Sequence, residues 1–159
     1  MMNPTLRNKI LMSSGFGTLI IASVMVKYFE GYSPVAYRDG SGIITVCYGH
    51  TGKDIIPDKW HSKAECEALL EKDLERVKKQ VDRLIKIETP ELTQAAIYSF
   101  VYNVGIGNFQ SSTLLKKLNA GCLNSACQQM KRWIYADGRV WKGLMTRRDV
   151  ESAICAGNI

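Results

Sequence analysis

The sequence predicts an α+β protein that is mainly helical and two-lobed, with a small N-terminal β-sheet, a long connecting helix and a helical C-terminal lobe. Three patterns predict this arrangement. A β-branched stretch split by glycines fills residues 37–56. One unbroken amphipathic pattern covers 63–85, and four shorter helical patterns follow from residue 89. A polymeric ligand is expected to lie in the cleft between two such lobes.

Length and composition indicate one globular unit. The 159 residues are 46% apolar and lack repeats, which excludes solenoid, collagen-like and disordered classes. The 21 Lys and Arg exceed the 15 Asp and Glu, giving a net charge of +6. This balance favours an anionic partner such as nucleic acid, a membrane surface or an acidic wall polymer, although a merely basic soluble protein has the same balance.

Residues 1–28 have the layout of a signal anchor. The run Ile10 to Val26 is seventeen residues long and uncharged, with Arg7 and Lys9 before it and Lys27 after it. Its many small residues predict weak insertion, and the positive-inside rule places the N-terminus in the cytoplasm and residues 29–159 outside. A cleaved signal peptide and a buried amphipathic helix of a cytoplasmic protein are the alternatives.

The small lobe is expected at about 29–61 as an antiparallel hairpin or meander, because glycines flank the run Ile43 to Tyr48. Next, Ser62-Lys63-Ala64-Glu65 forms a capping box, and apolar residues recur at three-to-four spacing after it. This predicts a connecting helix over about 63–85, roughly 35 Å long.

The helical lobe is expected over about 89–156. Thr89-Pro90 starts a helix that ends at Gly105, with Pro in its first turn. Three shorter helices are predicted from Ser112 to Asn119, Ser125 to Ala136 and Leu144 to Cys155, so that the second half of the chain is all helix.

The cysteines and histidines leave two interpretations open. Cys47-x2-His50 and His61-x4-Cys66 imitate the spacing of zinc ligands. The alternative is that Cys47 and Cys66 are half-buried thiols or a disulfide near the base of the sheet, with the histidines as hydrogen-bonding groups of the loops. Five Cys allow at most two bridges, and their pairing stays open.

Three residues suggest glycosidic chemistry. Glu30 follows the apolar segment directly, whereas Asp39 stands at the first strand turn, nine positions later. Two carboxylates in such different settings can hold different protonation states, which glycoside hydrolysis requires. The hydroxyl of Thr45, on the next strand, can help Asp39 hold a water molecule. Taken alone, such a spacing also arises by coincidence.

The spacing of Glu30, Asp39 and Thr45 resembles the catalytic pattern of phage-type lysozymes of glycoside hydrolase family 24. The stretches 45–52, 98–105, 112–115 and 143–148 are similar to endolysins of lambdoid phages, so the resemblance covers nearly the whole chain. It implies a muramidase that hydrolyses the β-1,4 bond between N-acetylmuramic acid and N-acetylglucosamine of peptidoglycan and lyses the host at phage release.

The resemblance also implies roles for single residues, without a cofactor or metal. Glu30 is then the general acid, and Asp39 with Thr45 directs water to the other face of the sugar, an inverting hydrolysis. Either Arg147 or Arg148 is expected beside Glu30, unless both are solvated arginines at a helix start. Further candidates for substrate binding or support are Asn103 and Ser112. The wall of the helical lobe is expected to include Trp133, Tyr135 and Trp141, for which core packing is favoured over sugar stacking.

For the N-terminal segment, the resemblance implies the signal-arrest-release class: an N-in, C-out anchor in the host inner membrane that later enters the periplasm. Only three residues separate Val26 from Glu30, so a membrane-held anchor keeps Glu30 at the bilayer surface. Some members are restrained by a Cys in the anchor, but this chain has none before Cys47. A monomer acting with a holin or pinholin, and without nucleic acid, is expected.

Three rival functions follow from the same sequence. A wall-binding module without turnover has the same fold, a lytic transglycosylase makes an anhydro product without Asp39 as base, and a basic nucleic-acid-binding protein has salt-dependent affinity for DNA.

Overall fold

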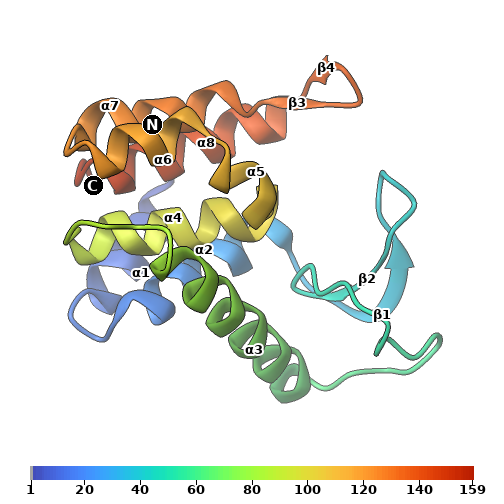
Figure 1. Cartoon of the computed structure of the whole chain (residues 1–159). Helices are drawn as coiled ribbons and strands as arrows, with labels where there is room; N and C mark the ends of the chain where they lie inside the picture. Colours follow the sequence, from blue (N-terminus) through green and yellow to red (C-terminus); the bar gives the residue numbers. More distant parts are fainter. Residues whose placement is uncertain (1) are drawn as a thin grey trace.

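A long helix joins the two lobes of the molecule, as Figure 1 shows for the computed structural model, which describes residues 2–159. The helices are α1 Pro4–Ser13, α2 Thr18–Glu30, α3 Lys63–Asp82, α4 Glu91–Val104, α5 Ile106–Gln110, α6 Thr113–Asn119, α7 Leu123–Gln129, the 3-10 helix η1 Met130–Arg132, and α8 Lys142–Cys155. The strands are β1 Ser33–Arg38, β2 Ile44–Cys47, β3 Tyr135–Ala136 and β4 Arg139–Val140. The expected fold class is confirmed.

The N-terminal segment forms part of the core of the helical lobe. Helix α2 packs against α4, and α4 packs in turn against α8. The apolar face of α2 is fully buried through Ile21, Ala22, Met25 and Val26. Among residues 2–159, no helix has both the length and the apolar character needed to cross a membrane.

The uncharged run of the sequence is split into two helices by a turn at residues 14–17. Ser14 is extended, with φ −62° and ψ 133°, and ends α1. Gly15 and Gly17 have φ of 87° and 109°, in the region that only glycine enters easily. Hydropathy predicts one apolar segment here, whereas the backbone angles of the two glycines reverse the chain between α1 and α2.

The small lobe is built on one antiparallel pair of strands. Tyr37 pairs with Thr45 and Arg38 with Ile44, and the turn between them holds Asp39. The sheet starts at Ser33, earlier than the sequence pattern predicts. A further bridge joins Val46 to His50 beyond β2.

The capping box of the connecting helix is confirmed. The Ser62 hydroxyl accepts from the Glu65 backbone N–H, and the Glu65 carboxylate accepts from that of Ser62. Helix α3 ends at Asp82, three residues before the expected end. A Cys47–Cys66 disulfide ties β2 to this helix, which confirms the disulfide interpretation and removes both thiolates from any zinc site.

The helical lobe differs from the expectation in its middle. Pro90 is the N-cap of α4 rather than a residue of its first turn. The expected helix from Ser125 to Ala136 is wrong: α7 ends at Gln129, and β3 and β4 form a hairpin. Asp137 and Gly138 both have positive φ at its turn, the two-residue geometry that Asp-Gly favours. A Cys127–Cys155 disulfide ties α7 to α8, and Cys122 is free and exposed.

Candidate active site

Glu30 is the last residue of α2, so the helix delivers its side chain to the junction of the two lobes. Gly31, with φ 72°, then turns the chain toward β1. The Glu30 side chain is 22% exposed, and its Oε1 accepts a hydrogen bond of 2.5 Å from Nη1 of Arg147. The Glu30 carboxylate is thus partly open to solvent and held by a guanidinium that is itself buried.

The loop after β2 closes tightly over this carboxylate. Gly49 has φ 82°, and a Cβ atom at this position would lie 3.1 Å from Oε2 of Glu30. The position therefore requires glycine for two reasons: the backbone angle and the space that Glu30 occupies. The hydroxyl of Tyr102 on α4 donates to the carbonyl oxygen of Tyr48 at 2.7 Å and holds the same loop.

Arg147 is held from behind by a buried carboxylate. Its Nε donates to Oε1 of Glu151 at 3.0 Å, and its Nη2 donates to the carbonyl oxygen of Ser99 at 3.2 Å. Glu151 is fully buried and also accepts from the Ser99 hydroxyl at 2.8 Å. The guanidinium lies 4.9 Å from the ring centroid of Phe29, which shields it further. Arg147 is therefore fixed in position before any ligand binds.

Arg148 completes the network on the side away from Glu30. It is 1% exposed, pairs with the second oxygen of Glu151 and donates to the Asn103 side chain. Its Nε donates to the carbonyl oxygen of Trp133 at 3.0 Å. The sequence left open which arginine lies beside Glu30; it is Arg147, and the alternative of two solvated arginines is wrong.

The two arginines differ in their electrostatic balance. Burial opposes the charge of Arg147, but the carboxylates of Glu151 and Glu30 outweigh it and raise the pKa of its guanidinium. At Arg148, burial is the largest influence and lowers the pKa of the guanidinium. The positive charge of Arg147 lowers this pKa further, and the carboxylate of Glu151 raises it too little to compensate. The neighbouring carboxylates thus favour the charged form of Arg147 more than that of Arg148.

Asp39 and Thr45 lie on the hairpin of the small lobe. Oδ1 of Asp39 accepts from the backbone N–H groups of Ser41 and Ile43, both at 2.9 Å, which fixes the carboxylate at the turn. Thr45 is 4% exposed, and its hydroxyl donates to the carbonyl oxygen of Ile43 at 3.1 Å. Both side chains are thus oriented by the same turn.

The remaining candidates fall outside this group. Asn103 reaches the site only through Arg148, while Ser112 is the buried N-cap of α6 and accepts from the Leu115 backbone N–H at 3.1 Å. Trp133 packs edge to face on Phe100, in agreement with core packing. The prediction of core packing is wrong for Tyr135 and Trp141, which are 63% and 51% exposed.

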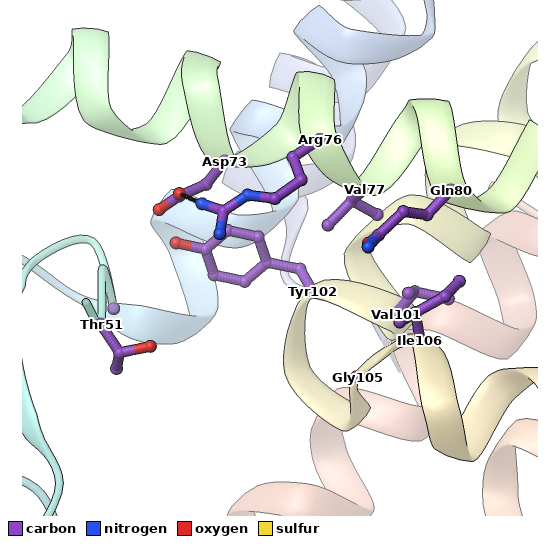
Figure 2. A pocket seen from close by; sticks show the side chains of 10 residues that line it. Thr51, Asp73, Arg76, Val77, Gln80, Val101, Tyr102, Gly105 and Ile106 are labelled. Atoms are coloured by element: carbon purple, nitrogen blue, oxygen red, sulfur yellow. Dashed lines mark hydrogen bonds and ion pairs between the residues drawn. The ribbon is translucent and has the colours of Figure 1, made fainter. Parts of the chain in front are cut away.

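A second polar cluster supports the lobe junction from α3. His50 is buried, with Nδ1 2.6 Å from Oδ2 of Asp73, and Asp73 also pairs with Arg76. Figure 2 shows the Asp73–Arg76 ion pair beside the Tyr102 ring. Both line a cavity of about 180 Å³ between α3, α4 and the loop that carries Thr51. Burial, with Asp73 and Glu30 nearby, raises the pKa of the Tyr102 phenol, which stays neutral. None of the proposed catalytic side chains lines this cavity.

The sequence did not single out the residues that hold Arg147 and the loop next to Glu30 in place. Glu151, Ser99, Gly49 and Tyr102 act through Arg147 or through the loop next to Glu30. Arg-Arg-x-x-Glu at 147–151 was a usable signal, because i,i+3 and i,i+4 spacing puts both arginines next to the glutamate on one helix.

Comparison with known proteins adds a family to this geometry. The phage lysozyme family model matches residues 27–151. The SAR-endolysin of bacteriophage PS119 is 51% identical over 97% of this chain and 96% of its own length. The endolysin of Escherichia coli O157:H7 phage FAHEc1 has a TM-score of 0.79 at 30% identity, covering 87% of this chain and 92% of that one.

A further solved structure shares the fold over the whole length. The active form of the P1 phage endolysin Lyz has a TM-score of 0.79 and covers 100% of this chain and 97% of that one, although the sequences are only 18% identical. A family match over most of the chain, a half-identical relative of the same length and the lysozyme-like fold agree. The chain belongs to the phage lysozyme family.

Proposed function

We propose that this chain is a muramidase endolysin, which hydrolyses the β-1,4 bond between N-acetylmuramic acid and N-acetylglucosamine and so lyses the host cell. The observation that carries the proposal is Glu30, held at the lobe junction between Arg147 and Gly49 in a chain of the phage lysozyme family. No observation favours a wall-binding module, a lytic transglycosylase or a nucleic-acid-binding protein.

Glu30 is the general acid in this proposal. Its proton goes to the glycosidic oxygen as the bond to the sugar breaks, which leaves Glu30 as a carboxylate. Arg147 Nη1, already 2.5 Å from Oε1, stabilises the carboxylate that forms. Glu151 holds the same guanidinium from its other side, so Arg147 keeps its position next to Glu30.

Asp39 and Thr45 act on the opposite face of the sugar. We assign to the free oxygen of Asp39 the role of base for the attacking water, since Oδ1 is occupied by two backbone N–H groups. Thr45 supplies a hydroxyl oxygen that can accept from the same water while its O–H donates to the Ile43 carbonyl oxygen. Asn103 and Arg148 support the site from within, without touching substrate.

The cellular part of the proposal concerns the N-terminal segment. SAR-endolysin relatives at about half identity indicate an endolysin that is first membrane-associated and then released. We assign it an N-in, C-out topology from Arg7 and Lys9, release into the periplasm, a monomeric enzyme and the help of a holin or pinholin. Residues 1–28 and 29–159 remain the proposed division of the chain.

The decisive experiment is a turbidity assay of the purified chain on chloroform-treated Gram-negative cells. Glu30→Gln keeps the shape but has no proton to deliver, so activity is expected to fall about a hundred- to ten-thousandfold. Glu75→Gln is the matched control, because Glu75 is exposed on α3 and the change in charge is the same. Activity of Glu30→Gln within threefold of wild type refutes the assignment, and an anhydro sugar product indicates a transglycosylase.

The water-holding pair is tested by a double-mutant cycle. Asp39→Ala and Thr45→Val each impair hydrolysis strongly, and their joint effect is smaller than the sum because both hold one water molecule. Fully additive losses would reduce Thr45 to a strand residue.

A further inference from the structure

The turn at residues 14–17 is where a membrane-held form and the folded enzyme must differ most. A segment that spans lipid keeps its backbone hydrogen bonds within one continuous helix. In the folded enzyme the same run is divided, since α1 ends at Ser13 and α2 begins at Thr18. The backbone N–H groups freed by this division need new acceptors.

One carboxylate provides them. Oε2 of Glu91 accepts from the Gly15 N–H and Oε1 from the Gly17 N–H, both at 3.0 Å. The partners are 76 and 74 positions apart in the sequence, so the contact exists only when the segment is folded back onto the lobe. Gly17 is the N-cap of α2 and has no side chain to cap the helix with. Glu91, the first residue of α4, thus caps a different helix.

The position of α2 matters because the helix ends at Glu30. Its buried face lies on α4, and Glu91 ties its start to the start of the same helix. Helix α2 is therefore held at both ends, by Glu91 at Gly17 and by Arg147 at Glu30. Without the first tie, the start of α2 is held to α4 by its buried face alone.

We propose that Glu91 is a positioning residue for the helix of the catalytic acid: its carboxylate captures the 14–17 turn once the segment has left the membrane. The membrane half of this inference rests on the proposed function. A charged carboxylate is costly in lipid, so it binds the turn only in water. Capture consequently opposes return of the segment to the bilayer and couples release to the placement of Glu30.

The two glycines of the turn contribute to its capture by Glu91. A Cβ at Gly15 or Gly17 would meet nothing within 4 Å, so an alanine there is opposed by the backbone angle alone. Alanine also favours a continuous helix over glycine by about fivefold. Gly17→Ala therefore shifts the balance toward the uncaptured form through the backbone, with the addition of only one methyl group.

The first test uses hydrogen exchange of the purified full chain. In Glu91→Ala, the amides of residues 14–17 and of the last turn of α2 are expected to exchange roughly ten- to a hundredfold faster, the range for hydrogen bonds to a charged group. Peptides of α8 keep their wild-type rates, which separates a local release from general loss of stability. Glu88→Ala is the control: Glu88 is exposed, and no hydrogen bond or ion pair of it is found among residues 2–159.

Equal exchange at 14–17 in Glu91→Ala and wild type overturns the proposal, as does equal acceleration in Glu88→Ala or across α8. Exchange does not depend on hydrolysis, so this result stands apart from the fate of the muramidase assignment. Lytic activity of Glu91→Ala is expected to fall at least severalfold, and Glu91→Gln, which keeps one acceptor oxygen, restores part of it.

The second test follows the segment in cells. After an uncoupler collapses the membrane potential, Gly17→Ala is expected to stay in the membrane fraction longer than wild type. Ser14→Ala is the matched variant, because it also makes the segment more apolar but sits at ordinary extended angles. Both proteins also carry Glu30→Gln, so that no lysis disturbs the fractions. Equal retention of the two variants overturns the role of the turn and leaves hydropathy as the cause.

Discussion

Glu151→Gln tests whether the buried charge network sets both the stability and the chemistry of the site. Glu151 is fully buried and pairs with Arg147 and Arg148, which are themselves buried. Glutamine has nearly the same shape and keeps one acceptor oxygen, but it removes the negative charge between the two guanidinium groups. Among residues 2–159, Arg147 then has only Glu30 as a carboxylate partner, and Arg148 has none.

The expected loss of stability follows from burial. Breaking a buried ion pair costs about 3–5 kcal/mol, and the retained oxygen places this variant at the lower end. For a chain of this length each kcal/mol lowers Tm by about 2–4 °C, so a fall of about 6–12 °C is expected in thermal unfolding followed by circular dichroism. Asp149→Asn, at a 65% exposed position of the same helix, is the matched control and should change stability by about 0.5 kcal/mol or less.

The same variant changes the pH dependence of hydrolysis. With Glu151 neutral, the positive charge of Arg147 next to Glu30 is no longer balanced by a buried carboxylate on its other side. The alkaline limb of the kcat/KM profile therefore moves toward lower pH, while Asp149→Asn leaves it in place. A Tm within 2 °C of wild type, together with an unmoved alkaline limb, would refute the reasoning.

Three further outcomes are expected. Asp73→Asn removes the negative charge 2.6 Å from buried His50 and should cost about 2 kcal/mol in urea unfolding, the contribution of a hydrogen bond to a charged group. Burial, and after it the hydrogen bond to Asp82, raises the pKa of Tyr98 to about 12. Because an unfolded tyrosine loses its proton near pH 10, the contribution of Tyr98 to the free energy of unfolding is full below pH 10 and is lost between pH 10 and 12. Tyr98→Phe is expected to show a shallower fall in stability over this range. Dithiothreitol should cost about 3 kcal/mol per disulfide, seen as a lower Tm.

The parts of the fold that local signals encode were predictable from the sequence. The capping box fixed the start of α3, because its two hydrogen bonds involve only Ser62 and Glu65. The short hairpin at 135–140 was missed although Asp137-Gly138 is a turn signal, since the helical period of the preceding residues outweighed it. Helix α7 ends at Gln129 because the chain must turn there to begin η1 and place Trp133 on Phe100.

The site was predictable only in its outer layer. Glu30, Asp39 and Thr45 could be proposed from their spacing only together with the family resemblance. Nothing local says that Glu151 is buried, since a glutamate on an amphipathic helix is usually solvated. Its burial depends on Ser99 of α4 and on two arginines of its own helix. The choice between Arg147 and Arg148 likewise depends on the direction from which α2 arrives, which is a property of the packed lobe.

The N-terminal segment carries two sets of requirements, and this explains why hydropathy alone described it incompletely. In the folded enzyme its apolar residues divide: Met25 and Val26 are fully buried against the lobe, whereas Met12 and Phe16 are 78% and 72% exposed. Their presence agrees with the proposed period in lipid, while the glycine turn and Glu91 serve only the folded state. The same run is thus uncharged along its sequence and divided by the glycine turn in the folded enzyme.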